Sequence, residues 1–282
     1  MPGIDLHTHS SVSDGTESPA ELIAAAVAAG LDVVALTDHD STAGWSSAFV
    51  AAEGTGITVV PGLELSTQLD YASVHVLGYL VDPENPALVE ETQRIRTERL
   101  HRAESMVSRI AADYALDWDD VVAQTSPGTT VGRPHIADAL VARGHVPDRT
   151  AAFESILHWR GGYYRPHEAP PPLAGVRLIA EAGGVAVIAH PGTRGPERVL
   201  AGRRMRELVA AGLFGLEVHH RDHNPATRKR WTAIATKYGL VATGSSDYHG
   251  LGKPNRLGEN TTDPEVYAAI VARGTGSKPF TG

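Results

Sequence analysis

The chain contains 282 residues, of which 25 are Lys or Arg and 33 are Asp or Glu, so its formal net charge is −8. Hydrophobic residues make up 42% and charged residues 21%, a balance that excludes a disordered or collagen-like chain. The absence of cysteine excludes disulfides, cysteine-based zinc sites, iron–sulfur clusters and a thiol nucleophile, and the acidic balance argues against binding of duplex nucleic acid through overall charge.

The N-terminal residues lack the basic region and the apolar region that together mark a signal peptide. The longest apolar stretch, residues 22–31, is too short to span a bilayer. We therefore expect a cytoplasmic protein that makes no membrane contact.

Short apolar runs alternate with helical patterns along most of the chain. Ser18, Pro19 and Glu21 form a capping box with proline at the first helical position, and Gly30 is expected to end the helix that begins there. The alternation predicts an α/β fold with a mostly parallel sheet, open or closed. The predicted strands are residues 4–9, 33–37, 57–61, 74–80, 185–189, 215–219 and 240–243.

The middle of the chain has a different character. Residues 90–109 are polar, with apolar residues at helical spacing, and residues 134–143 form a second helical pattern. Residues 161–172 are rich in Gly and Pro and are typical of a linker. We predict a helical insertion, or lid, over residues 95–167 within one α/β domain made of residues 1–94 and 168–282.

Strand 4–9 ends in His7 and His9, with Thr8 between them. Residues i and i+2 of a strand point to the same side, so both imidazoles can reach one metal ion. Taken alone, this pattern is more typical of two surface histidines than of a metal site.

Similar residues stand at or near other predicted strands, and their number changes that interpretation. Parallel α/β sheets place their sites at the carboxyl ends of the strands, so we expect these side chains to meet on one rim. The candidate ligands are His7, His9, Asp14, His39, Glu64, His75, His190, Asp247 and His249.

These residues, in this order and spacing, resemble the motifs of the PHP (polymerase and histidinol phosphatase) family of the amidohydrolase superfamily. The resemblance extends from Ile4 to about Gly250. The segment Val131 to His135 resembles a narrower branch, whose members remove the 3′-phosphate from 3′,5′-nucleotide bisphosphates and some of whose relatives trim RNA from its 5′ end.

The resemblance implies a distorted (β/α)7 barrel that carries three divalent metal ions. By motif position, the first ion is held by His7, His9, Glu64 and Asp247. The second is held by Glu64, His75 and His190, and the third by Asp14, His39 and His249. Many family members have histidine at the position of Asp14, and aspartate there fits the nucleotide-bisphosphate branch.

The ligand chemistry is consistent with the centre that the resemblance implies. Mixed imidazole and carboxylate ligands suit Mn, Fe or Zn, whereas Ca and Mg prefer oxygen ligands. With three divalent ions, three ligand carboxylates and a bridging hydroxide, the formal charge of the site is about +2, which suits a phosphate dianion. An acidic protein can therefore bind an acidic substrate.

The expected reaction is hydrolysis of a phosphate ester. A metal-bridging hydroxide would attack phosphorus in line, so that no protein nucleophile is needed. The proton for the leaving group could come from metal-bound water, Asp247 or His249.

Three residues are candidates for substrate binding. Arg133 could grip a phosphate through two hydrogen bonds and His135 could donate one, both from the insertion, which would close over the substrate. His223 follows another apolar run and could also face the substrate. Arg194 is a weaker phosphate candidate.

Several other polar residues are predicted to be structural or solvated. His219 and His220 should pack or hydrogen-bond locally, and the basic run from Arg94 to Arg102 should form a solvated helix face paired with nearby glutamates. His101, His145, His158 and His167 should be surface or structural residues. The aromatic side chains cannot be placed near the rim from sequence, so no determinant of nucleobase preference is visible.

We predict a metal-dependent phosphoesterase that acts on a small phosphorylated substrate, namely a 3′,5′-nucleotide bisphosphate such as adenosine 3′,5′-bisphosphate. Four alternatives remain open at this point. They are 5′→3′ exonuclease activity on short RNA, histidinol-phosphate hydrolysis, amide or ester hydrolysis, and a metal-stabilised scaffold without catalysis.

Overall fold

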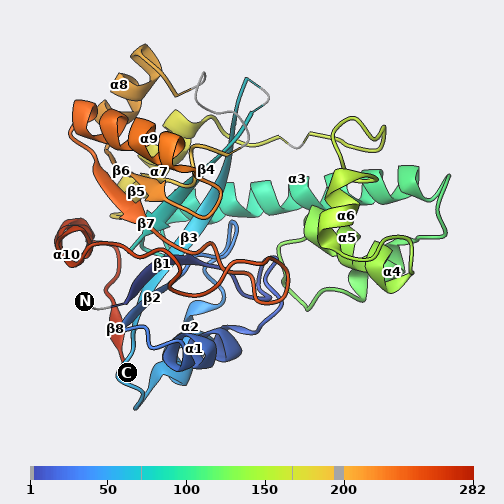
Figure 1. Cartoon of the computed structure of the whole chain (residues 1–282), viewed down its shortest axis with the longest axis horizontal. Coiled ribbons are helices and arrows are strands. Elements are labelled where there is room, and N and C mark those ends of the chain that lie inside the picture. Colours follow the sequence, from blue (N-terminus) through green and yellow to red (C-terminus); the bar gives the residue numbers. More distant parts are fainter. Residues whose placement is uncertain (1–2, 71, 167, 194–199) are drawn as a thin grey trace.

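The computed structural model describes residues 3–70, 72–166, 168–193 and 200–282. Its strands form one sheet in the order β1-β2-β3-β4-β5-β6-β7, with β8 attached to β3 (Figure 1). Two residues with predicted roles, His167 and Arg194, lie outside the described residues. The strands are β1 (Ile4–Thr8), β2 (Val33–Leu36), β3 (Thr58–Leu69), β4 (Ala72–Tyr79), β5 (Val185–Ile188), β6 (Leu213–His219), β7 (Val241–Gly244) and β8 (Phe280–Thr281).

The helices fall into two groups. Most surround the sheet, whereas α3 leads away from it to α4, α5 and α6, which lie to one side (Figure 1). The helices are α1 (Pro19–Ala28), α2 (Trp45–Ala52), α3 (Pro86–Ile110), α4 (Trp118–Val122), α5 (Arg133–Ala142), α6 (Arg149–Glu154), α7 (Pro172–Glu181), α8 (Arg203–Ala210), α9 (Pro225–Tyr238) and α10 (Pro264–Arg273).

Strand direction divides the sheet into two parallel parts. β1, β2 and β3 are parallel to one another, as are β5, β6 and β7. β4 lies between the two parts and is antiparallel to both neighbours. The sheet curls until the ends of β1 and β7 approach each other, where the His9 backbone N–H donates to the Tyr248 carbonyl at 2.8 Å. The predicted fold class, a distorted (β/α)7 barrel, is confirmed.

Local sequence signals determine the first helix as predicted. Ser18 accepts from the Glu21 backbone at 3.2 Å, and the Glu21 carboxylate accepts from the Ser18 backbone at 2.8 Å. This capping box satisfies amide groups that the first turn leaves without helical partners. Gly30 follows the helix with φ of 74°, a conformation that glycine adopts without strain.

The barrel and the insertion have separate hydrophobic clusters that share one long helix. In the first half of α3, Leu88 and Ile95 pack into the barrel cluster. In its second half, Met106 and Ile110 pack into a cluster formed with α4, α5 and α6. The predicted boundary at residue 95 thus falls inside a continuous helix, and the division of the chain into domains stays a prediction.

Within the described residues, no helix is both long enough and apolar enough to cross a membrane.

Candidate metal centre

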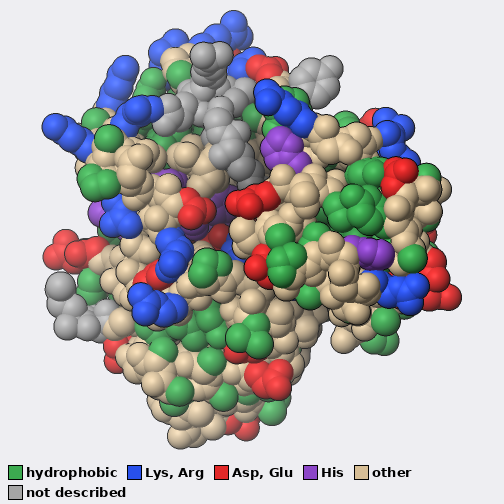
Figure 2. Space-filling view, turned by 45° about the vertical axis from the view of Figure 1, so that its right-hand side comes forward, with side chains coloured by type: hydrophobic (Ala, Val, Ile, Leu, Met, Phe, Trp, Pro, Cys, Tyr) green, Lys and Arg blue, Asp and Glu red, His purple; other side chains and the backbone are tan. Residues whose placement is uncertain are grey.

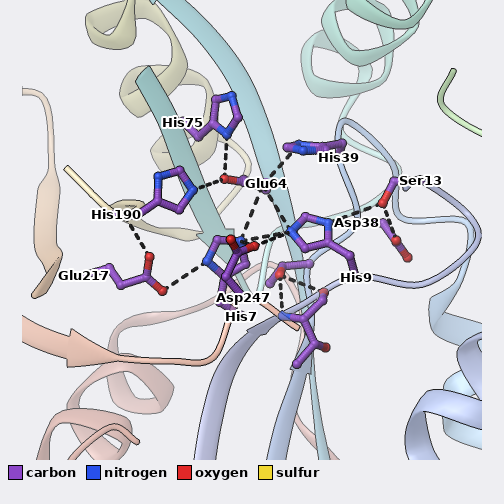
Figure 3. Close-up of polar contacts among 12 residues, drawn as sticks. His7, His9, Ser13, Asp38, His39, Glu64, His75, His190, Glu217 and Asp247 are labelled. Carbon is purple, nitrogen blue, oxygen red and sulfur yellow. Dashed lines mark hydrogen bonds and ion pairs between the residues drawn. The ribbon is translucent and has the colours of Figure 1, made fainter. Parts of the chain in front are cut away.

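His7 and His9 lie at the end of β1, and their side chains meet (Figure 3). Both residues are fully buried, and the Nε2 atoms of the two rings are 3.0 Å apart. Asp247 Oδ1 is 3.5 Å from each of these nitrogens. Two imidazole nitrogens and a carboxylate oxygen that converge in this way have the donor set of a transition-metal site.

Glu64 lies at the centre of the cluster, where five histidines surround its carboxylate. Oε1 is 2.7 Å from His75 Nδ1 and 3.0 Å from His190 Nε2. Oε2 is 3.1 Å from His39 Nδ1 and 3.2 Å from His9 Nε2. The nearest nitrogen of His7, Nε2, is 3.4 Å from Oε2. A carboxylate surrounded by imidazoles in this way could contribute to a metal site through either oxygen.

The antiparallel direction of β4 explains how His75 reaches this site. Glu64 lies in the middle of the long strand β3, and its neighbour on the same face, Ser66, pairs with His75 of β4. Because β4 runs against β3, its first half lies at the rim where the parallel strands end. A histidine early in β4 therefore joins residues that follow other strands.

Asp14 and His249 form the other side of the cluster. Asp14 Oδ1 is 3.2 Å from His249 Nε2 and 3.6 Å from His9 Nδ1. The His249 Nδ1–H donates to the Asp247 carbonyl at 2.8 Å, so that the lone pair of Nε2 points toward Asp14.

The described part of the cluster leaves several buried polar atoms without hydrogen-bond partners. These atoms are Asp14 Oδ1, His39 Nδ1 and His249 Nε2. Buried polar atoms are almost always paired, and metal coordination would pair these. Four overlapping groups of side chains could hold a metal ion: His7, Glu64 and His190; His7, His9 and Asp247; His9, His39 and Glu64; and His9, Asp14 and His249. The residues present therefore fit divalent metal ions.

The protonation states of Glu64, His190 and His249 suit metal binding. Burial raises the pKa of Glu64, but the surrounding imidazoles outweigh that effect and hold it well below its usual value, so the carboxylate is ionised. Burial lowers the pKa values of His190 and His249 to about 4, so both imidazoles are neutral at pH 7. Anionic carboxylates and neutral imidazoles are the ligand forms of these groups. Burial lowers the pKa values of His7 and His9, but the neighbouring carboxylates outweigh that effect and raise both, that of His9 to about 9.

Two of these candidate ligands have unusual backbone conformations. His190 has φ of 28° and Asp247 has φ of 55°. Non-glycine residues with positive φ are strained, and they persist where surrounding contacts hold them. The His190 backbone is held by Glu217, whose Oε2 accepts its N–H at 2.7 Å.

Glu217 is a site residue whose role the sequence did not reveal. It is fully buried on β6, and its Oε1 accepts from His7 Nδ1 at 3.0 Å. Burial raises its pKa, but the imidazoles of His7 and His220 outweigh that effect and lower it to about 2. One ionised carboxylate thus orients two predicted ligands, His7 and His190. The signal in the sequence that could have revealed this role is the position of Glu217 on the strand that follows the His190 motif.

The cluster forms the floor of a cavity of about 450 Å³. Figure 2 shows histidine and acidic side chains at the bottom of a hollow in this face. The opposite wall comes from the insertion, mainly from α5 and α6. Five basic side chains line the cavity, namely Arg99, Arg102, Arg133, Arg149 and Lys253.

The three predicted substrate residues lie in different environments. Arg133 lines the cavity, and its guanidinium carbon lies 5.1 Å from the Phe153 ring centroid and 5.3 Å from that of Tyr164. His135 is buried, and its Nδ1 accepts from the Gly132 backbone at the start of α5. His223 Nδ1 donates to the Val218 carbonyl, and its Nε2 accepts from the Gly192 backbone.

Both ring nitrogens of His223 are thus occupied by backbone groups, and the ring supports the loop that follows His190. His135 caps its own helix. Of the three candidates, Arg133 is the one that the structure places on the cavity wall. A substrate role for His135 or His223 stays a prediction that this geometry does not favour.

The prediction of a fully solvated basic run on α3 was wrong for two of its arginines. Arg94 pairs with Glu91 on the exposed face, as predicted. Arg99 instead turns inward, is only 6% exposed and donates to Ser66 at 2.9 Å. Arg99 and Arg102 both line the cavity, because one face of α3 is turned toward the site.

His158 and Lys253 are among the residues that line the cavity without having been predicted to do so. His158, which follows α6, was expected to be a surface or structural residue. Lys253 places its Nζ 2.7 Å from Asp247 Oδ2, the carboxylate oxygen turned away from His7 and His9. Neither residue is part of a strand-end motif, so sequence patterns did not single them out.

Comparisons with known proteins agree with this geometry. The PHP domain matches residues 5–130. A 3′,5′-nucleoside bisphosphate phosphatase of Chromobacterium violaceum is 36% identical over 93% of each chain. A phosphoribosyl 1,2-cyclic phosphate 1,2-diphosphodiesterase of Eggerthella lenta is 33% identical over 87% of this chain and 94% of its own. A 5′-3′ exoribonuclease of Haemophilus influenzae is 31% identical over 87% of this chain and 89% of its own.

Solved structures show the same fold over nearly the whole chain. A Bifidobacterium adolescentis protein, described as a candidate metal-dependent phosphoesterase, matches with a TM-score of 0.93, 42% identity and 97% coverage of both chains. An amidohydrolase from Chromobacterium violaceum, with bound sulfate and no metal, matches with a TM-score of 0.87, 34% identity and 96% coverage of both chains.

A curled α/β barrel with a buried cluster of histidines and carboxylates on its rim is characteristic of a class of metal-dependent hydrolases. Within that class, the chain belongs to the PHP family.

Proposed function

We propose that this protein is a metal-dependent phosphatase that removes the 3′-phosphate from 3′,5′-nucleoside bisphosphates. The observation that carries the proposal is a cavity whose lining has three chemically different parts. Its floor is the candidate metal centre and its sides are basic. The wall formed by α6 and the residues after it carries Phe153 and His158. The similarity to the Chromobacterium violaceum phosphatase supports this choice of substrate.

The proposed centre holds three divalent ions, Mn or Fe, with Zn as the alternative. His7, His9, Glu64 and Asp247 would hold the first ion; Glu64, His75 and His190 the second; and Asp14, His39 and His249 the third. When bound, such ions activate water and stabilise the negative charge that develops during phosphate ester hydrolysis.

The protein's own side chains would bind and orient the substrate. The basic residues of the cavity wall attract a phosphorylated substrate to an acidic protein, because local charge outweighs net charge at short range. The sulfate bound in the related Chromobacterium structure is consistent with an anion site in this fold.

Asp247 and His249 were predicted as possible proton donors to the leaving group. Burial raises the pKa of Asp247, but Lys253 and the neighbouring histidines outweigh that effect and hold it well below its usual value. His249 directs its Nε2 lone pair at Asp14. These geometries favour ligand roles for Asp247 and His249, and the Lys253 side chain lines the cavity beside Asp247.

Replacing Arg133 by Ala should weaken use of every phosphorylated substrate. A charged hydrogen bond to phosphate contributes roughly 1.5–3 kcal/mol, so we expect kcat/KM to fall by about 10- to 150-fold. The control is Arg143→Ala, an exposed arginine of the same insertion that donates to the Ala115 carbonyl. Equal kcat/KM values for the Arg133 variant and the wild type would show that Arg133 is a bystander.

Phe153 supplies an aromatic face for the nucleobase, which the sequence could not locate. Stacking of a base on an aromatic ring contributes roughly 1–3 kcal/mol. Phe153→Ala should therefore lower the preference for adenosine 3′,5′-bisphosphate over ribose 3,5-bisphosphate by about 5- to 150-fold.

The substrate without a base separates stacking from general damage at the site. An equal loss of kcat/KM for both substrates would mean that Phe153 supports Arg133 and not the base. Trp159→Ala is the matched aromatic control, since this residue is 62% exposed and is not among the cavity-lining residues.

A substrate panel tests the proposal as a whole. Manganese-loaded protein should release phosphate fastest from a 3′,5′-nucleoside bisphosphate. The panel also includes 5′-phosphorylated short RNA, histidinol phosphate, a ribose cyclic phosphodiester, and an amide or carboxylic ester. Faster turnover of RNA would favour the exoribonuclease alternative. If none of these compounds is hydrolysed, the remaining alternative is the non-catalytic scaffold.

A further inference from the structure

The insertion contacts the loop that carries Asp14 at three backbone carbonyls. Thr129 Oγ1 donates to the Ser11 carbonyl at 3.0 Å, and the Thr130 N–H donates to the Val12 carbonyl at 2.9 Å. Arg149 Nη1 donates to the carbonyl of Asp14 itself at 3.0 Å. The insertion thus holds the backbone of a candidate metal ligand as well as covering the cavity.

Arg149 is fixed in this position by a second contact. Its Nε and Nη2 atoms donate to the two carboxylate oxygens of Asp138, with Nη2 at 2.6 Å from Oδ2. Asp138 belongs to α5 and Arg149 begins α6, so the ion pair joins two helices of the insertion. The two side chains are only 14% and 25% exposed. A planar guanidinium held at two atoms leaves Nη1 aimed in one direction.

Gly252 leaves the space that Arg149 occupies. A Cβ atom on Gly252 would lie 2.1 Å from Arg149 Nη1 and 3.2 Å from the His249 carbonyl. The Gly252 backbone N–H donates to that same carbonyl at 3.1 Å. Arg149 Nη1 therefore lies between the loop of Asp14 and the loop of His249, the two ligands whose side chains meet at 3.2 Å.

We propose that Arg149 is a positioning residue that couples the insertion to the metal site formed by Asp14 and His249. Docking of the insertion places the Asp14 carboxylate opposite His249, and a metal ion held by these two residues in turn stabilises the docked insertion. This reciprocity follows because each event favours the same arrangement of the Asp14 loop. The inference rests on the proposed metal centre.

The experiment measures manganese binding to the full chain in the absence of substrate. Two variants disturb Arg149 in different ways. Arg149→Gln removes the donor to the Asp14 carbonyl, and Gly252→Ala leaves the arginine intact but takes its space. The control is Arg143→Gln, because Arg143 also pairs with a carboxylate and donates to a carbonyl, but entirely within the insertion.

Both test variants should bind one manganese ion about 10- to 100-fold more weakly than the wild type, with the remaining ions and the control unchanged. Equilibrium dialysis with metal analysis gives the number of bound ions. Electron paramagnetic resonance of the bound manganese reports whether the magnetic coupling between neighbouring manganese ions is lost. Thermal unfolding identifies any variant that fails to fold, in which case the other variant decides.

Two results would overturn the proposal. Wild-type manganese binding in both folded variants, together with a raised KM, would mean that Arg149 contacts substrate and does not position Asp14. Uniform weakening of all ions would mean that the variants damage the whole rim. Failure of the proposed function is distinguishable from both, because then the wild-type protein would bind no manganese or would hydrolyse no phosphate ester.

Discussion

Replacement of Glu64 by Gln should remove almost all phosphatase activity, with a fall in kcat/KM of at least about a thousandfold. Its carboxylate contacts the imidazoles of His75, His190 and His39 within 3.1 Å, and an amide offers one weaker ligand oxygen in place of two charged ones. A metal ion contributes several kcal/mol to transition-state stabilisation, and each 1.36 kcal/mol is a factor of ten in rate.

The measurement combines metal analysis of the purified variant with steady-state kinetics on the preferred substrate. Metal content should fall together with activity, because Glu64 is the proposed shared ligand of two ions. Glu53→Gln is the control, since Glu53 is exposed at the end of α2. A Glu64 variant with full metal content and wild-type kinetics would falsify the proposed centre.

Glu217→Gln should have the second large effect, although Glu217 is not a proposed ligand. Its two oxygens accept from His7 Nδ1 at 3.0 Å and from the His190 backbone at 2.7 Å. An amide has one oxygen and one NH2 group, so one of these two donors would face another donor. Loss of such a supporting contact typically weakens metal binding by about 10- to 100-fold.

The expected primary effect is a loss of manganese affinity, and the loss of activity follows from it. Titration with manganese should show weaker binding, and activity should recover in part at high manganese concentration because the ligands themselves remain. Glu207→Gln is the matched control, since Glu207 forms a salt bridge with Arg203 at the surface. Reduced activity at unchanged manganese affinity would instead indicate that Glu217 acts on the reaction directly.

The candidate ligands could be found from sequence because their signal is local. A histidine, aspartate or glutamate beside a short apolar strand is visible without knowledge of the neighbours, and the topology of parallel sheets brings such positions to one rim. His75 shows the limit of this reasoning. It stands early in its strand and reaches the rim because β4 is antiparallel, which the alternation of apolar runs did not predict.

The sequence was least informative for residues whose surroundings depend on what packs against them. Arg99 has the sequence context of a solvated helix face, yet α3 presents it to Asp40 and Ser66. His223 has the context of a site residue, yet two backbone groups occupy its ring nitrogens. In both cases the side chain could interact with several kinds of partner, and the packing of the folded chain determines which partners it contacts.

The sequence alone determined which chemical groups this protein can bring to a metal site, and in which order along the chain. It did so because strands impose a period of two on their side chains and because buried strands are short apolar runs. The tertiary structure alone decided which groups support those ligands. Glu217 and Arg149 act on His7 and Asp14, which are 210 and 135 residues away in the sequence, and contacts of that range exist only when folding brings the segments together.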